Sequence, residues 1–138
     1  MYVLAFDRDW TVDVNPHPRY EAVPLEWVRY WAHDTDHEMW AIGSQEPVDG
    51  ADILGTVELI CRRNGGIDAL GEQDAYGYYE WWPERGERLH IFADLFPDAV
   101  EYIALGDLDF SHIDGWTHYH ACDFLDAIDE GRITLPVP

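Results

Sequence analysis

The sequence of 138 residues has no lysine, only two cysteines and no long apolar run. Cys61 and Cys122 are too few for a disulfide framework, so nothing indicates an oxidising compartment. A membrane span needs about 18 consecutive apolar residues, which are absent, and no basic and apolar leader begins the chain. We therefore expect a cytoplasmic protein that does not enter a membrane.

Charge is strongly one-sided, with 28 acidic residues against eight arginines and a formal net charge of −20. This surface repels nucleic-acid phosphates and anionic lipids, so we expect neither as a partner. High net charge destabilises a compact chain by self-repulsion, which salt screens. The composition therefore predicts a protein adapted to high salt, as in halophilic archaea; an acidic protein from ordinary salt is the alternative.

Short runs that are apolar at every position predict parallel strands covered on both faces. The three clearest runs are Val3–Phe6, Met39–Ile42 and Tyr102–Leu105. A weaker strand is expected at 67–70. Helical patterns between the runs make the fold class α/β: a Rossmann-like three-layer domain with a mainly parallel sheet, formed as one domain over residues 1–138.

Four helices are expected from apolar residues at helical spacing. Their inward-facing residues are Leu25, Val28 and Trp31 after Pro24; Ile53, Val57, Ile60 and Cys61; Leu89, Phe92 and Leu95 after Pro83; and Ala121, Leu125 and Ile128 before Gly131. Residues 71–83 are rich in tyrosine and tryptophan, and we expect them to form a loop or hairpin insert. We interpret this insert as an aromatic packing surface, with a lid over a substrate as the alternative.

The first polar residues after the three apolar runs are Asp7, Ser44 and Asp107. Open α/β sheets bind ligands beyond the carboxyl ends of their strands, so these side chains are expected to share one site. Carboxylate and hydroxyl oxygens suit Mg²⁺, which also offsets the repulsion between an anionic nucleophile and a phosphate. A second Asp-x-Asp triplet, Asp34 to Asp36, has no apolar strand before it and is interpreted as a solvated loop.

The segment from Phe6 to Val12 is an apolar strand end followed by Asp-x-Asp-x-Thr. It resembles the first motif of the haloacid dehalogenase-like (HAD) phosphohydrolase superfamily. The second motif, a strand ending in Ser or Thr, resembles Met39–Ser44, and the acidic fourth motif resembles Tyr102–Asp109. The resemblance covers roughly the whole chain and points to a small branch of the superfamily from halophilic archaea.

The resemblance implies a role for each motif residue. Asp7 is the nucleophile that forms an aspartyl-phosphate, and Asp9 is the general acid and base. Thr11 holds the loop around them and takes part in substrate binding, and Ser44 donates a hydrogen bond to a phosphate oxygen.

The resemblance also implies a cation site and a cationic side chain. Asp107 and Asp109 bind Mg²⁺ together with Asp7 and the backbone carbonyl of Asp9. The third motif of the family is usually a lysine, which this chain lacks; Arg88 is the best-placed replacement and Arg85 the second.

The expected function is therefore a Mg²⁺-dependent phosphohydrolase of small phosphoesters. Residues 13–23 leave room for a small flap and no large cap, so the site is expected to be open or covered by a second subunit of a homo-oligomer. One alternative is a catalytically degenerate HAD-like module that binds a ligand or a protein. A second is a zinc-binding protein that uses His118 and His120, with Cys122 at the next alternating position.

Overall fold

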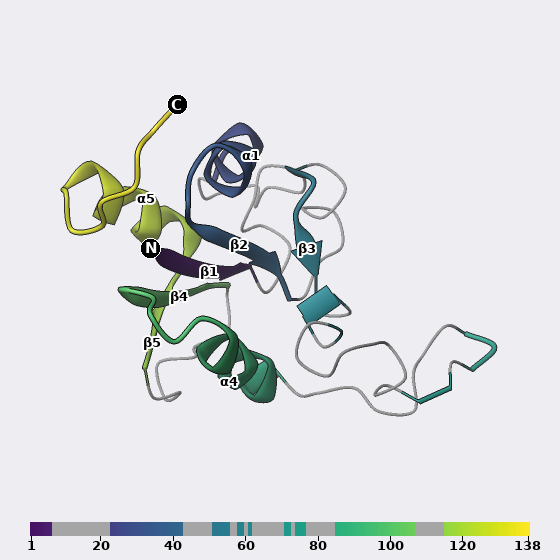
Figure 1. Ribbon diagram of the computed structural model, residues 1–138. Helices are drawn as coiled ribbons and strands as arrows, with labels where there is room; N and C mark the ends of the chain where they lie inside the picture. Colours follow the sequence, from purple (N-terminus) through teal and green to yellow (C-terminus); the bar gives the residue numbers. More distant parts are fainter. Residues whose placement is uncertain are drawn as a thin grey trace.

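The computed structural model describes residues 1–6, 23–42, 51–55, 58–59, 61, 71–72, 74–76, 85–106 and 115–138, with the backbone alone at 85 and 86. Within these residues the chain forms a parallel β-sheet with helices on both faces (Figure 1). Such an arrangement is Rossmann-like and belongs to the α/β class.

The sheet in the described part of the chain has five strands, and every neighbouring pair runs parallel. The strands are β1 (Tyr2–Phe6), β2 (Glu38–Ala41), β3 (Leu54–Gly55), β4 (Glu101–Leu105) and β5 (Trp116–Tyr119). Their order is β3-β2-β1-β4-β5, which places β1 at the centre. Residues 3 to 6 of β1 are at most 1% exposed, which explains why this strand is apolar at every position.

The last residues of the strands lie in one row across the sheet. Phe6 of β1 pairs with Ala41 of β2 on one side and with Leu105 of β4 on the other. Ala41 in turn pairs with Gly55, and Leu105 pairs with Tyr119. All five strands therefore end at one edge, which we call the carboxyl edge and define by these five residues.

The described residues form three helices longer than two turns: α1 (Leu25–His33), α4 (Arg85–Leu95) and α5 (Ala121–Asp129). Pro24 directly precedes α1, where its lack of an N–H costs the helix nothing. Gly131 follows α5 with a φ of 76°, the left-handed conformation in which glycine commonly ends a helix. None of the helices in the described ranges has the length and apolar character needed to cross a membrane.

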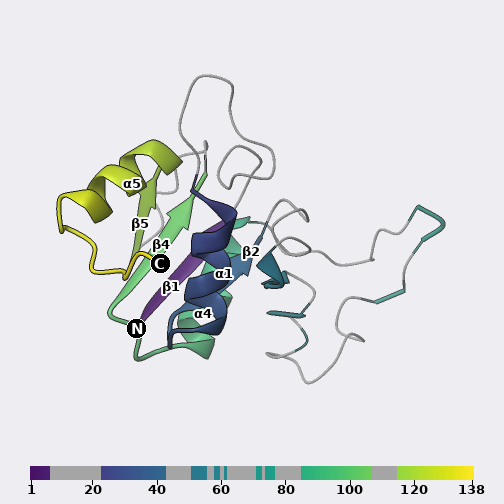
Figure 2. The same ribbon diagram turned by 90° about the horizontal axis from the view of Figure 1, so that it is seen from above.

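Each face of the sheet has its own apolar core. Leu4 and Phe6 of β1 belong to the core that α1 and α5 cover. Val3 and Ala5, which alternate with them, belong to the core that α4 covers. Figures 1 and 2 show α1 and α5 on one side of the sheet and α4 on the other. Because successive side chains of β1 point to opposite faces of the sheet, this one strand contributes to both cores.

Aromatic side chains fill both cores. Under α1 and α5, the rings of Trp31 and Phe124 meet edge to face with centroids 6.0 Å apart. Under α4, Phe92 lies between Trp40 and Trp116, with centroid separations of 5.4 and 5.9 Å. All five rings are at most 6% exposed, so they contribute both buried apolar area and ring–ring contacts.

Most of the expected elements are confirmed. The three apolar runs coincide with β1, β2 and β4 to within one residue, and three of the four helical patterns coincide with α1, α4 and α5. The buried positions of α5 are Phe124 and Ala127, whereas Leu125 and Ile128 pack only partly against the core. The α/β class and the parallel sheet are therefore confirmed, while the HAD-like core with a small cap and the single-domain boundaries stay predictions.

The helix expected to begin at Ile53 is wrong at its start, because Leu54–Gly55 forms β3 beside β2. Two paired residues leave too short a pattern to distinguish a strand from a helix. The pattern also does not predict β5, because an edge strand with Thr117 and His118 at its centre lacks the continuous apolar run of a buried strand. The strand expected at 67–70 and most of the insert at 71–83 lie outside the described residues.

At the end of the sheet where the strands begin, His37, the residue before β2, binds the start of β1. Its Nδ1 accepts a hydrogen bond from the backbone N–H of Tyr2 at 3.0 Å, and the two rings lie 5.4 Å apart. Because this nitrogen accepts, it carries no proton in the native state. Burial lowers the pKa of His37, and the amino-terminal ammonium lowers it further, against an opposing effect of Asp36.

Phe92→Ala should lower the free energy of unfolding by about 3–5 kcal/mol, because it leaves a cavity between two tryptophans. The matched control is Tyr76→Ala, whose side chain is 87% exposed and whose loss should change stability by less than about 0.5 kcal/mol. Urea unfolding in molar KCl measures both. Equal losses for the two variants would contradict the core described here.

Protonation of His37 should destabilise the fold, since the unfolded chain binds a proton near the ordinary pKa of 6.5 and the native ring does so only at lower pH. The contribution of His37 is therefore complete above about pH 6.5 and is lost as the pH falls below it. His37→Asn keeps an acceptor at the Nδ1 position and does not titrate. Urea unfolding over a pH series should show that the free energy of unfolding of this variant falls less below pH 6.5 than that of the wild type. The same fall in both proteins would refute the stabilising role of neutral His37.

Candidate active site

The order of the strands reverses at β1: the chain adds β2 and β3 on one side of this strand, and β4 and β5 on the other. From β1 the chain passes through α1 to β2 on one side, and β4 on the other side of β1 follows α4, which covers the opposite face. Open α/β sheets bind their ligands at the carboxyl ends of the strands at such a reversal. The central position of β1 therefore makes the end of this strand, at Phe6, the middle of the candidate site.

Backbone pairing continues one residue beyond the strands on both sides of β1. The N–H of Ile42 donates to the carbonyl of Phe6 at 2.9 Å, and the N–H of Gly106 donates to the carbonyl of Tyr119 at 3.3 Å. Ile42 is 2% exposed, and Gly106 is buried as well. The segments that leave β2 and β4 therefore start from fixed and buried positions.

Six of the predicted site residues come after the strand ends of this edge in the sequence, and all six lie outside the described residues. They are Asp7, Asp9, Thr11, Ser44, Asp107 and Asp109. Their described neighbours are Phe6, Ile42 and Gly106, which the sheet brings to one edge. The pairing of Phe6 with Ala41 and Leu105 is the prerequisite for a shared site. The side chain of Arg85, the second candidate for the third motif, also lies outside the described residues.

Arg88 is the predicted site residue whose side chain is described. It belongs to the first half of α4, is 9% exposed, and is the one buried charged side chain in the described ranges. Its Nη1 donates a hydrogen bond to the carbonyl of Ile42 at the carboxyl edge. Taking a guanidinium out of water is costly unless acceptors surround it, so this position constrains both α4 and the end of β2. Arg88 therefore contacts the chain at Ile42, which is two residues before Ser44 in the sequence.

His118 contacts the same edge from β5. Its Nε2 lies 2.8 Å from the carbonyl oxygen of Gly106, and because a carbonyl only accepts, Nε2 carries the hydrogen. The ring also packs edge to face against His120, with centroids 5.1 Å apart. The sequence pattern pointed to the histidine pair but not to the contact with Gly106, which joins β5 to the residue that follows β4.

The arrangement expected for zinc is not formed in the described part of the chain. β5 ends at Tyr119 and α5 begins at Ala121, so Cys122 lies in a helix and does not continue the strand alternation of His118 and His120. Across the described ranges, no three or more His, Cys, Asp or Glu side chains are grouped so that they could hold a metal ion. The packed histidine pair is therefore the arrangement observed.

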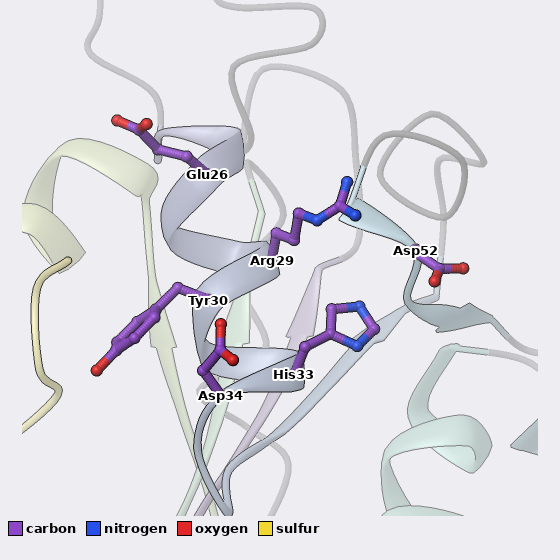
Figure 3. Close-up of a pocket in the computed structure, with 6 residues that line it drawn as sticks. All are labelled: Glu26, Arg29, Tyr30, His33, Asp34 and Asp52. Atoms are coloured by element: carbon purple, nitrogen blue, oxygen red, sulfur yellow. The ribbon is translucent and has the colours of Figure 1, made fainter.

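A hollow of about 370 Å³ lies along α1 and the segment before β3 (Figure 3). The described residues that line it are Glu26, Arg29, Tyr30, His33, Asp34 and Asp52. Arg29 and His33 extend from α1 toward the Asp52 segment, and the Nε2 of His33 lies 3.0 Å from the carbonyl oxygen of Ala51. The described lining thus combines two basic side chains with three carboxylates.

Comparison with protein-family models, with curated proteins and with solved structures found no match. The resemblance to the HAD superfamily is therefore based on the motifs alone and stays a prediction. The parallel sheet, the shared carboxyl edge and the buried Arg88 are observations that do not depend on it.

Arg88→Met should lower the free energy of unfolding by about 1–3 kcal/mol, because the buried carbonyl of Ile42 loses a donor. Arg132→Met is the matched control: the 2.8 Å pair of Arg132 with Glu130 is more than half exposed and is worth less than about 1 kcal/mol. Urea unfolding in molar KCl compares them. A larger loss for Arg132→Met would show that the Arg88 contact does not stabilise the fold.

Proposed function

We propose that this protein is a Mg²⁺-dependent phosphohydrolase that cleaves small phosphoesters through an aspartyl-phosphate, on a three-layer HAD-like core with at most a small cap. The observation that carries the proposal is the pairing of Phe6 with Ala41 and Leu105. Neighbouring strands in a sheet are about 4.8 Å apart, so these three strand ends lie within reach of one phosphate group. The next polar residues in the chain are Asp7, Ser44 and Asp107.

The proposed reaction has two steps. In the first, a carboxylate oxygen of Asp7 attacks phosphorus, the bond from phosphorus to the leaving oxygen breaks, and Asp9 donates a proton to that oxygen. In the second, Asp9 removes a proton from water, which attacks phosphorus and releases phosphate from Asp7. Thr11 holds the loop that carries both aspartates.

The donor set of the site suits the cation. Carboxylates of Asp7, Asp107 and Asp109 and the carbonyl of Asp9 are oxygen ligands, the kind that Mg²⁺ prefers. When bound, the cation reduces the repulsion between the Asp7 carboxylate and the phosphate. Ser44 donates a hydrogen bond to a phosphate oxygen in this arrangement.

Arg88 supports the proposal from the described part of the chain. Phosphoryl transfer needs fixed positive groups near the phosphate oxygens, in addition to any cation. In a chain with no lysine, this requirement falls on an arginine, and Arg88 is held at the carboxyl edge by the carbonyl of Ile42. A buried position suits that role, because an arginine there is screened less by salt than one on the surface.

The composition completes the proposal. A net charge of −20 and the absence of lysine favour a salt-adapted, cytoplasmic enzyme whose substrate is a small phosphorylated molecule and not a nucleic acid. An open site without a large cap is compatible with a homo-oligomer in which a second subunit covers the site.

Asp7→Asn should lower phosphate release by about 10³-fold or more, because an amide cannot form the aspartyl-phosphate. The assay is a panel of phosphoesters, including p-nitrophenyl phosphate, in molar KCl with and without Mg²⁺. Asp34→Asn, the same change in the exposed second Asp-x-Asp triplet, should retain wild-type activity within about twofold. Circular dichroism checks that both variants are folded.

Full activity of Asp7→Asn would refute the assigned nucleophile. Activity of the wild-type protein that does not respond to Mg²⁺ or to its removal by chelation would refute the cation. A wild-type protein that binds phosphate without turnover would instead support the catalytically degenerate module.

A further inference from the structure

Gly106, the residue that follows β4, is bound to β5 through both of its backbone polar groups. The N–H of Gly106 donates to the carbonyl of Tyr119 at 3.3 Å, and the carbonyl of Gly106 accepts from the Nε2 of His118 at 2.8 Å. Gly106 is buried, so these partners matter more than they would in water. This double attachment lies at the carboxyl edge.

His118 supplies a donor at the point where the β ladder stops. In a parallel pair, a residue that donates to the carbonyl of Tyr119 accepts in turn from the N–H two residues further along that strand. Here that N–H belongs to Ala121, the first residue of α5, where the chain has already left the sheet. The imidazole of His118, which is a residue of β5 and pairs with Ala104, provides the hydrogen bond to Gly106 from a side chain instead.

The carbonyl of Gly106 belongs to the planar peptide group that joins Gly106 to Asp107. A hydrogen bond to this oxygen therefore restrains the orientation of the unit from which Asp107 extends. Partners that orient a metal ligand without touching the metal change metal affinity or activity by about 10–100-fold when they are removed.

We infer that His118 is a positioning residue of the candidate site: through the Gly106 carbonyl it holds the end of β4 so that Asp107 can bind the cation. The inference rests on the proposed function, because Asp107 is a cation ligand only there. It assigns to His118 a role in the affinity for Mg²⁺ and not in the chemical step.

Removing the donor tests this role. His118→Phe keeps an aromatic ring at the position without an N–H, and His118→Gln keeps an N–H donor without the ring. We expect His118→Phe to weaken Mg²⁺ binding by about 10–100-fold and His118→Gln to retain most of the wild-type affinity. The matched control is His120→Phe, since His120 shares the ring contact and its side chain makes no capping hydrogen bond to α5.

Two measurements in molar KCl read out the result. Calorimetric titration with Mg²⁺ alone gives the affinity of the folded protein without turnover, and phosphate release against Mg²⁺ concentration gives the half-maximal value and kcat at saturation. A purely structural role of His118 would lower the urea midpoint but leave the Mg²⁺ affinity of the folded protein unchanged. A positioning role shifts the Mg²⁺ affinity while saturating Mg²⁺ restores most of kcat.

The inference fails while the proposed function stands if the wild-type protein binds Mg²⁺ and Asp7→Asn abolishes activity, yet His118→Phe binds Mg²⁺ as tightly as the wild type. It is likewise overturned if His120→Phe weakens binding as much as His118→Phe. A wild-type protein that binds no Mg²⁺ overturns the inference and the proposed function together. If His118→Phe does not fold, His118→Met, which also lacks an N–H donor, is judged by the same criteria.

Discussion

The pairing of β1 with strands on both of its sides is the interaction on which the rest of the structure depends. Val3, Leu4 and Ala5 are 0% exposed, so their backbone N–H and C=O groups have no water to bind and need partners in β2 and β4. The same strand contributes to both cores, because its alternate side chains face opposite helix layers. A shift of register in β1 would exchange these side chains between the two cores and would separate the strand ends that define the carboxyl edge.

The acidic composition of the chain contrasts with the one charged side chain that is buried in the described ranges, Arg88. The chain carries 28 acidic residues against eight arginines, and none of the carboxylates in the described ranges is buried. Carboxylates in such excess repel one another and depend on salt for screening. Arg88 instead lies in the α4 core, where burial weakens the effect of salt on its charge. Its hydrogen bond to Ile42 connects α4 to the residue that follows β2. A fixed cation of this kind would suit the phosphate site that we propose.

The two strands that flank β1 end in different ways. Beyond β2, the carbonyl of Ile42 accepts a hydrogen bond from Arg88 of α4. Beyond β4, the carbonyl of Gly106 accepts one from His118 of the neighbouring strand β5. In both cases a side-chain nitrogen continues the hydrogen bonding at the point where backbone pairing stops. Buried carbonyls without such donors would be costly, so Arg88 and His118 have a structural reason to be where they are even before any function is considered.

The local signals of the sequence are sufficient for much of this fold. Runs that are apolar at every position predict β1, β2 and β4, and proline and glycine at the helix ends predict α1 and α5, because each of these signals depends on neighbouring residues only. The same signals do not predict β3 or β5, since a two-residue strand and a half-polar edge strand are formed by pairing with a partner. For the candidate site, the sequence alone determined which acids follow apolar runs. Only the tertiary structure decided that those runs end in one row, that Arg88 reaches a carbonyl 46 residues away and that His118 binds Gly106. Such contacts join residues that are distant in the chain, and they form only when the whole sheet and its helices have packed together.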